Sequence, residues 1–138
     1  MSAVVSAFSC VVWPPMPKRF IAKTAAVISG TKYFYLRAGA DHKFIPVWVV
    51  VVDGRVLVRP WNDKAKGWYR TFLADGNGAV KVDEKEVPVR AVPVKTKALL
   101  DAMDAAYAAK YTTKANRPYV TGFATPKRRA TTLELIPA

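Results

Sequence analysis

The stretch Val47–Val58, VWVVVVDGRVLV, decides the fold expected for this chain. An Asp-Gly pair separates two apolar runs, and this pair favours the tight turn of a two-stranded hairpin. The first run has no polar side, whereas a half-exposed strand would alternate polar and apolar residues. We therefore expect a hairpin whose first strand is covered on both faces, inside by a barrel and outside by a helix or a second subunit.

Four more strand-like segments surround this hairpin along the chain. They are Thr31–Ala38, Ala79–Asp83, Glu86–Val94 and Thr131–Ile136. The second and third form another hairpin, and the two prolines of Glu86–Val94 predict a position near a sheet edge, because proline cannot donate a ladder hydrogen bond. With the two strands of the first hairpin, the sequence predicts six strands.

Apolar residues at helical spacing predict three helices, one before the strands, one between the two hairpins and one after the second hairpin. One follows Pro17 and ends at Gly30, a short one covers Gly67–Ala74, and a third begins after Thr96 and runs to Lys110. The basic, proline-containing stretch Thr112–Ala130 is expected to be a loop. The fold class is therefore mainly β with helices (α+β): a six-stranded antiparallel barrel with an N-terminal helix and a helix near the C-terminus.

The composition points to an anionic partner. Across 138 residues, 22 Lys and Arg against 10 Asp and Glu leave a net charge of +12. Such a field attracts a phosphorylated cofactor, nucleic acid or an anionic membrane surface, and it also fits a surface that is merely basic. The single cysteine, Cys10, and the single histidine, His42, exclude an intrachain disulfide and a cysteine-built metal site, so no metal is expected.

The first fifteen residues differ from the rest of the chain. They are uncharged, lack the basic start of a signal peptide, and end in a Pro-Pro pair that interrupts the apolar run before it could cross a membrane. We expect residues 1–15 to be a disordered leader or an upstream extension of a gene whose start codon is Met16. Residues 16–138 are then one domain of a cytoplasmic protein.

A candidate phosphate loop follows the hairpin. The chain delivers Arg59 from a strand into a loop that contains Lys64 and Lys66, and Gly67 then begins a short helix that contains Arg70. Helix N-terminal amides, lysine charges and planar guanidinium groups together suit phosphate. The alternative is a solvated turn.

The residue order from this loop onward resembles that of the deazaflavin-dependent nitroreductase family. In both, an apolar strand and a basic loop precede a Trp-Tyr pair, here Trp68-Tyr69, that opens a helix ending in Leu-Ala-Asp. Residues 104–111, DAAYAAKY, and residues 131–137, TTLELIP, are still more similar to an uncharacterised prokaryotic family of the same clan, the pyridoxamine-phosphate-oxidase-like split barrels. The resemblance covers roughly Phe20 to Pro137.

This resemblance implies a split barrel that binds flavin mononucleotide (FMN) or a deazaflavin nucleotide and transfers a hydride to a small organic acceptor. By position, Lys64, Lys66 and Arg70 would hold phosphate, Arg59 would border it, and Trp68 would form a wall of the site. The loop lacks the Gly-Gly and His-Pro-Ala elements of the nitroreductases, which leaves the choice between FMN and deazaflavin open. The cleft in such barrels is often shared by two subunits. From the two-sided burial of residues 47–52 we expect a homodimer with this hairpin at or near the interface.

Two tyrosines of the later helix are candidate proton donors in such an enzyme, Tyr107 and Tyr111. Tyrosines on the apolar stripe of a helix are also typical core or interface residues, and that interpretation stands beside the catalytic one.

Two other function classes remain open. Residues 32–37, KYFYLR, interleave basic and aromatic side chains on a strand, as barrels that bind single-stranded nucleic acid do. The alternative is an ordinary strand in which half of these aromatic rings face inward as part of the core. The third possibility is a non-catalytic ligand-binding or structural protein. No membrane partner is expected.

Overall fold

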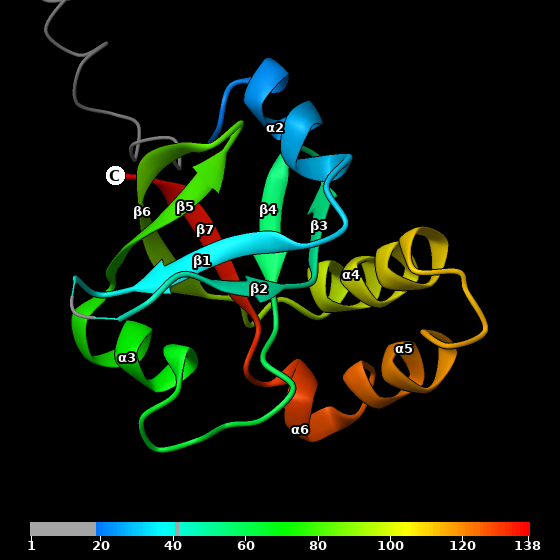
Figure 1. The fold of residues 1–138 in the computed structure, drawn as a ribbon. Helices are drawn as coiled ribbons and strands as arrows, with labels where there is room; N and C mark the ends of the chain where they lie inside the picture. Colours follow the sequence, from blue (N-terminus) through cyan, green and yellow to red (C-terminus); the bar gives the residue numbers. More distant parts are fainter. Residues whose placement is uncertain (1–18, 41) are drawn as a thin grey trace, which may run out of the picture.

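Seven antiparallel strands form one sheet that curls into a nearly closed barrel in the computed structural model, which describes residues 19–40 and 42–138 (Figure 1). The strands are β1 (Phe34–Ala38), β2 (Ile45–Val47), β3 (Val49–Val52), β4 (Arg55–Val58), β5 (Asn77–Val82), β6 (Lys85–Pro93) and β7 (Leu133–Pro137). Their order in the sheet is β2-β1-β5-β6-β7-β4-β3. The fold class is confirmed, with seven strands instead of six because the short β2 pairs with β1. The expected leader, residues 1–15, lies outside the described residues.

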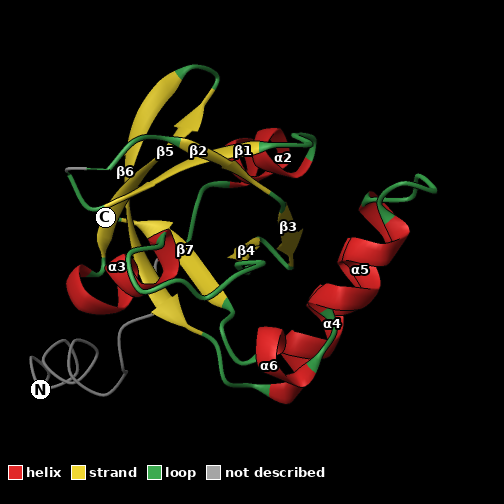
Figure 2. Ribbon diagram, turned by 60° about the horizontal axis from the view of Figure 1, so that its bottom comes forward, coloured by secondary structure: helices red, strands yellow, loops and turns green. Residues whose placement is uncertain are grey.

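Helices cover the barrel on several sides. They are α2 (Ala22–Ser29), α3 (Trp68–Asp75), α4 (Lys97–Lys110), α5 (Arg117–Phe123) and α6 (Pro126–Arg129). The first three match the helices expected from the sequence, but the expectation of a loop over Thr112–Ala130 is wrong. Both α5 and α6 begin with a proline in their first turn, where its missing N–H costs no intrahelical hydrogen bond. In Figure 2, α4, α5 and α6 lie on one side of the barrel and α3 on another.

The β3–β4 hairpin has the predicted turn. Asp53 and Gly54 both have positive φ angles, 51° and 77°, as a two-residue turn of this kind requires. The two-sided burial of β3 is also confirmed: Val49 packs inside the barrel, whereas its neighbour Val50 packs outward in a second core cluster with α4. The outer face is thus covered by a helix of the same chain, and this strand requires no second subunit to be buried.

Strand β6 lies inside the sheet, so the prediction of an edge position is wrong. It pairs with β5 on one side and with β7 on the other. Pro88 is tolerated because it lies beside the end of β7, where its carbonyl accepts a hydrogen bond from the N–H of Ala138 and no further ladder donor is needed on that side. Pro93 is the last residue of β6.

The gap in the barrel is crossed by the chain itself. Strands β2 and β3 lie at opposite ends of the sheet order, yet only Trp48 separates them in sequence. This crossing leads the chain from one edge of the sheet to the other and places Trp48 between the barrel and the helices α4 and α5. Within the described part of the chain, no helix is long and apolar enough to cross a membrane.

Candidate functional site

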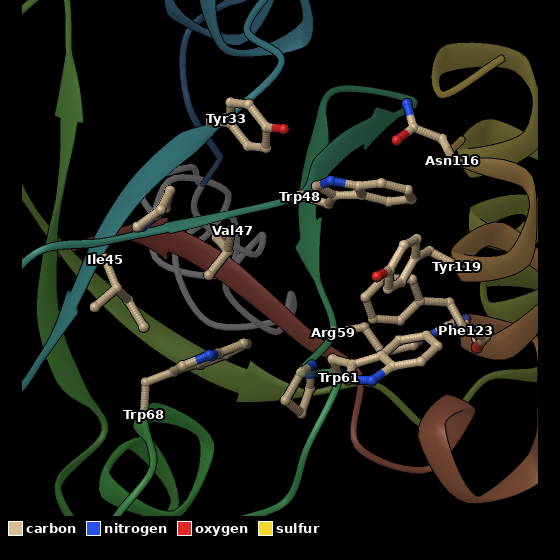
Figure 3. Close-up of a pocket in the computed structure, with 12 residues that line it drawn as sticks. Tyr33, Ile45, Val47, Trp48, Arg59, Trp61, Trp68, Asn116, Tyr119 and Phe123 are labelled. Carbon is tan, nitrogen blue, oxygen red and sulfur yellow. Dashed lines mark hydrogen bonds between the residues drawn. The ribbon is translucent and has the colours of Figure 1, made fainter. Parts of the chain in front are cut away.

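A cavity of about 430 Å³ opens where the chain crosses between β2 and β3 (Figure 3). Most of its wall is aromatic or aliphatic, and we call it the aromatic cavity. Its lining residues are Tyr33, Ile45, Pro46, Val47, Trp48, Arg59, Pro60, Trp61, Trp68, Asn116, Tyr119 and Phe123. They come from both sides of the barrel gap, from the chain after β4, from the start of α3 and from the region of α5.

A second cavity, of about 490 Å³, adjoins the first. It contains three lysines, and we call it the basic cavity. Its lining residues are Ala38, His42, Lys43, Ile45, Trp61, Asn62, Lys64, Lys66, Gly67 and Trp68. Because Ile45, Trp61 and Trp68 line both cavities, the two form neighbouring parts of one cleft with an apolar end and a cationic end.

The back wall of the aromatic cavity is held rigidly. The indole of Trp48 stacks on the ring of Tyr111, with the centroids 3.9 Å apart and the planes 2° from parallel. The Tyr111 hydroxyl donates to the carbonyl of Lys32 at 2.6 Å and accepts from the N–H of Val49 at 3.1 Å. The ammonium of Lys110 donates to the Val49 carbonyl at 2.7 Å. Helix α4 thus holds both the crossing chain and the end of the segment before β1.

Arg59 is a buried cation in the wall of the aromatic cavity. Only 2% of the surface of Arg59 is exposed. Its Nε donates to Thr132 Oγ1 at 2.7 Å, and its Nη1 donates to Asp104 Oδ1 at 2.6 Å and to the carbonyl of Phe123 at 2.8 Å. Asp104 also pairs with Arg129. These contacts join the end of β4 to α4, α5 and the residue before β7, and they fix the guanidinium in place.

The third nitrogen of the Arg59 guanidinium differs from the other two. Nη2 is buried and has no hydrogen-bond partner among the described residues. A buried donor without a partner loses the free energy of its hydration, about 1–3 kcal/mol, unless a ligand or water accepts from it. The sequence placed Arg59 beside the phosphate loop, whereas the structure places it in the lining of the aromatic cavity and not of the basic one.

Lys64, Lys66 and Trp68, three residues of the predicted phosphate site, line the same cavity. The two lysines are exposed and line the basic cavity beside the N-terminus of α3. Gly67 is the N-cap of this helix, no side chain caps it, and its first turn contains no acidic residue. The amides at the start of α3 therefore add to the positive potential of the lysines.

Arg70 lies apart from these lysines. It is on the first turn of α3 but lines neither cavity. Its guanidinium makes two hydrogen bonds to the carboxylate of Asp63, Nε to Oδ1 at 2.7 Å and Nη2 to Oδ2 at 2.9 Å. The hydrogen bond from Arg70 lowers the pKa of Asp63 from its ordinary value. In this structure the arginine stabilises the loop before α3.

The hydroxyls of both candidate tyrosines lie in the core cluster outside β3. Neither Tyr107 nor Tyr111 lines the aromatic or the basic cavity. Burial raises the pKa of Tyr107 above its ordinary range and raises the pKa of Tyr111 to about 12. The Tyr107 hydroxyl is buried without a partner among the described residues. The Tyr111 hydroxyl is engaged in holding the crossing chain.

Several lining residues were not predicted from the sequence as parts of a cofactor site. Trp48, Trp61, Tyr119 and Phe123 come from segments far apart in the chain, and the last two lie on a helix that the sequence did not predict. Tyr33 was noted only in the basic-aromatic strand pattern. It is 48% exposed, whereas Phe34 next to it is buried, as expected for a strand with one inward face.

The fold and the cleft define a small antiparallel-barrel protein with an aromatic cavity beside a basic one. The chain belongs to the family described as uncharacterized protein conserved in bacteria (DUF2255), whose model matches residues 33–135. No curated protein matches it in sequence.

The solved structures that are similar to this one include two of low sequence identity. The conserved hypothetical protein Rv2991 from Mycobacterium tuberculosis has a TM-score of 0.51 at 15% identity, over 90% of this chain and 83% of that one. A FAD-binding protein from Mesorhizobium loti has a TM-score of 0.48 at 12% identity, over 84% of this chain and 86% of that one. The likeness to Rv2991 supports the barrel fold.

Proposed function

We propose that this protein binds a phosphorylated flavin or deazaflavin nucleotide in the two-part cleft and is an oxidoreductase that transfers a hydride to a small organic acceptor. The observation that carries the proposal is the continuity of the two cavities: a wall of aromatic rings leads directly to a cluster of lysines at a helix N-terminus. A planar ring system with a phosphate-bearing chain has the same two halves.

The residues present fit such a ligand. The aromatic cavity and the basic cavity, about 430 and 490 Å³, each fall in the size range of small-molecule sites. Trp48, Trp61 and Trp68 offer flat surfaces for a ring.

At the other end of the cleft, Lys64 and Lys66 would bind phosphate together with the amides at the start of α3. Lys43 and His42 line the same cavity. The His42 Nε2 lies 3.3 Å from the hydroxyl of Thr71, which holds the ring beside α3. Arg70, paired with Asp63, would support the loop rather than contact phosphate directly.

The bound ring would supply the hydride chemistry, and the protein would bind it, orient it and keep water from its face. That division of labour needs no catalytic dyad of side chains. Tyr107 and Tyr111 would then act as packing residues behind the wall, because their hydroxyls lie outside both cavities.

The direct test is the identity of the small molecule that the protein carries. The protein is purified from its native host, because another host can lack deazaflavin, and is then denatured. We expect the released material to show the absorption spectrum and mass of a flavin or deazaflavin nucleotide. Co-purified nucleic acid, with binding that weakens steeply as salt rises, would support single-strand binding instead. Release of neither, together with no binding of added FMN or deazaflavin, would contradict the proposal.

A further inference from the structure

Trp61 is the residue that separates the cavities. Its side chain lines both the aromatic and the basic cavity, and it is 36% exposed. The rings of Tyr119 and Phe123 pack against it in T-shaped geometry, with centroids 5.0 and 5.1 Å away. The guanidinium of Arg128 lies over its ring at 3.7 Å from the centroid. The indole is therefore held between the side chains of α5 and α6.

The close approach of this indole to α5 depends on Gly122. A Cβ at position 122 would lie 2.7 Å from Cζ3 of Trp61 and closer still to Cη2. Gly122 is not one of the glycines with a positive φ angle, so its backbone would accept an alanine. The absence of a side chain at this position serves the packing of Trp61 and not a turn.

A Cβ at position 122 would push the Trp61 indole away from α5. Arg128 occupies its face, donating from Nε to the Trp61 carbonyl at 2.8 Å and from Nη1 to the Gly122 carbonyl at 3.2 Å. Figure 3 shows α5 on one side of Trp61 and Trp68 on the other, across the cavity. Displacement away from α5 would therefore carry the indole into the space that Trp61 and Trp68 both line.

We propose that Gly122 determines the size of the ring system that the aromatic cavity accepts, because it allows Trp61 to lie back against α5. Gly122 is thus a positioning residue that acts through Trp61. The inference rests on the proposed function for the kind of ligand involved, but the position of the indole is a property of the protein alone.

The test compares a large and a small ring in four variants: the unchanged protein, Gly122→Ala, Trp61→Phe and the double variant. The ligands are FMN, with three fused rings, and phenyl phosphate, with one. We expect Gly122→Ala to weaken FMN binding about tenfold or more, as a methyl group that alters a pocket does, and phenyl phosphate binding by less than about threefold. Trp61→Phe removes the two atoms that would clash, so the double variant should bind FMN about as well as Trp61→Phe alone.

The matched control is Gly30→Ala at the end of α2, where a Cβ would meet only carbonyl oxygens at 3.7 and 3.8 Å. It should leave the binding of both ligands unchanged. If alanine at position 122 weakens FMN tenfold in the Trp61→Phe background too, Gly122 acts by some other route and the inference is wrong. That comparison holds even if Gly122→Ala alone does not fold.

Crystal structures of the unchanged protein and Gly122→Ala separate this inference from the proposed function. We expect the indole to move towards Trp68 until its contact with the new Cβ reaches the 3.4 Å or more of ordinary packing. For a variant that does not fold, the structure of the double variant is used, in which the phenyl ring should keep its place. An unmoved indole with a displaced α5 would overturn the inference, whether or not the protein binds FMN. Failure of the unchanged protein to bind FMN, with the indole displaced as expected, would count against the proposed function alone.

Discussion

The aromatic cavity has a buried cation, Arg59, with three hydrogen-bonded partners, whereas the cations of the basic cavity, Lys64 and Lys66, are exposed and take part in none of the ion pairs among the described residues. The walls differ in the same way. Trp48 stacks on Tyr111, and the backbone of the next residue, Val49, is hydrogen-bonded to the side chains of Tyr111 and Lys110. The lysines of the basic cavity lie on a solvent-exposed loop. One half of the cleft thus has a packed wall, and the other offers exposed positive charge. We expect the first to set which ring fits and the second to add affinity for phosphate.

The largest expected effect is a loss of stability when the hydrogen bonds of Arg59, in the buried half of the cleft, are removed. Arg59→Leu would leave the carbonyl of Phe123 and the hydroxyl of Thr132 without their donor and Asp104 with one cation fewer. Loss of one partner from a buried charged network costs about 3–5 kcal/mol. Urea unfolding should show a loss of this size in the free energy of unfolding.

The control is Arg70→Leu, which breaks the exposed pair with Asp63. Exposed pairs contribute little, because solvent screens them, so the free energy of unfolding should hardly change. Equal losses for Arg59→Leu and Arg70→Leu would mean that the buried network around Arg59 stabilises the fold no more than an exposed ion pair does.

An intermediate effect is expected from removing a shared wall. Trp68 lines both cavities. Stacking of a base on an aromatic ring contributes about 1–3 kcal/mol, so Trp68→Ala should weaken FMN binding by about tenfold or more. The measurement is a titration followed by flavin fluorescence. Tyr35→Ala, which removes an exposed ring of β1 outside both cavities, is the matched control and should bind as the unchanged protein does. Equal losses for the two variants would show that Trp68 makes no wall for the ring.

The smallest expected effect is a change in the pH dependence of stability caused by Lys110, which lies behind the wall of the aromatic cavity. Burial lowers the pKa of Lys110 to about 8, from an ordinary 10.5. Between these values the unfolded chain binds more protons than the folded one, so this lysine makes stability rise with pH from about 8 towards 10.5. Lys110→Met should reduce that rise. The free energy of unfolding is measured at pH 8, 9 and 10, before the buried Tyr111, whose pKa is raised to about 12, makes the folded state less stable at higher pH.

Lys97→Met is the control for the pH series, because Lys97 is exposed on the first turn of α4. It should leave the slope of stability against pH as it is in the unchanged protein. A Lys110→Met protein with the same slope as Lys97→Met would show that burial of this ammonium has no effect on stability.

Local patterns in the sequence were enough to predict most of the barrel. The Asp53-Gly54 turn, the unbroken apolar run before it and the periodicity of α4 are all determined by residues close together in the chain. Two predictions that were based on prolines are wrong. Pro88 lies in a central strand only because β7 ends beside it, and the prolines of α5 and α6 begin short helices that a proline-rich stretch conceals.

The basic half of the cleft was predictable and the aromatic half was not. Lys64, Lys66 and Trp68 fall within five residues of one another, so one loop and one helix start bring them together. The aromatic wall depends on contacts between distant segments, such as the stacking of Trp48 on Tyr111. Arg59 shows the limit most clearly: in sequence it precedes the basic loop, but its hydrogen-bond partners are Asp104, Phe123 and Thr132.

The most direct test of the account measures how much the phosphate group of FMN contributes to binding, with and without the lysines of the basic cavity. The dissociation constants of FMN and of riboflavin, its dephosphorylated analogue, are measured for the unchanged protein and for Lys64→Ala/Lys66→Ala. The charge-matched control is Lys23→Ala/Lys95→Ala, two exposed lysines that line neither cavity. Each charged contact contributes about 1.5–3 kcal/mol, so we expect FMN to lose about a hundredfold or more in affinity in the first variant, riboflavin to change little, and the control to bind both as the unchanged protein does. Equal losses of FMN affinity in the two double variants, or equal losses for FMN and riboflavin, would contradict the claim that the two cavities form one site for a phosphorylated ring.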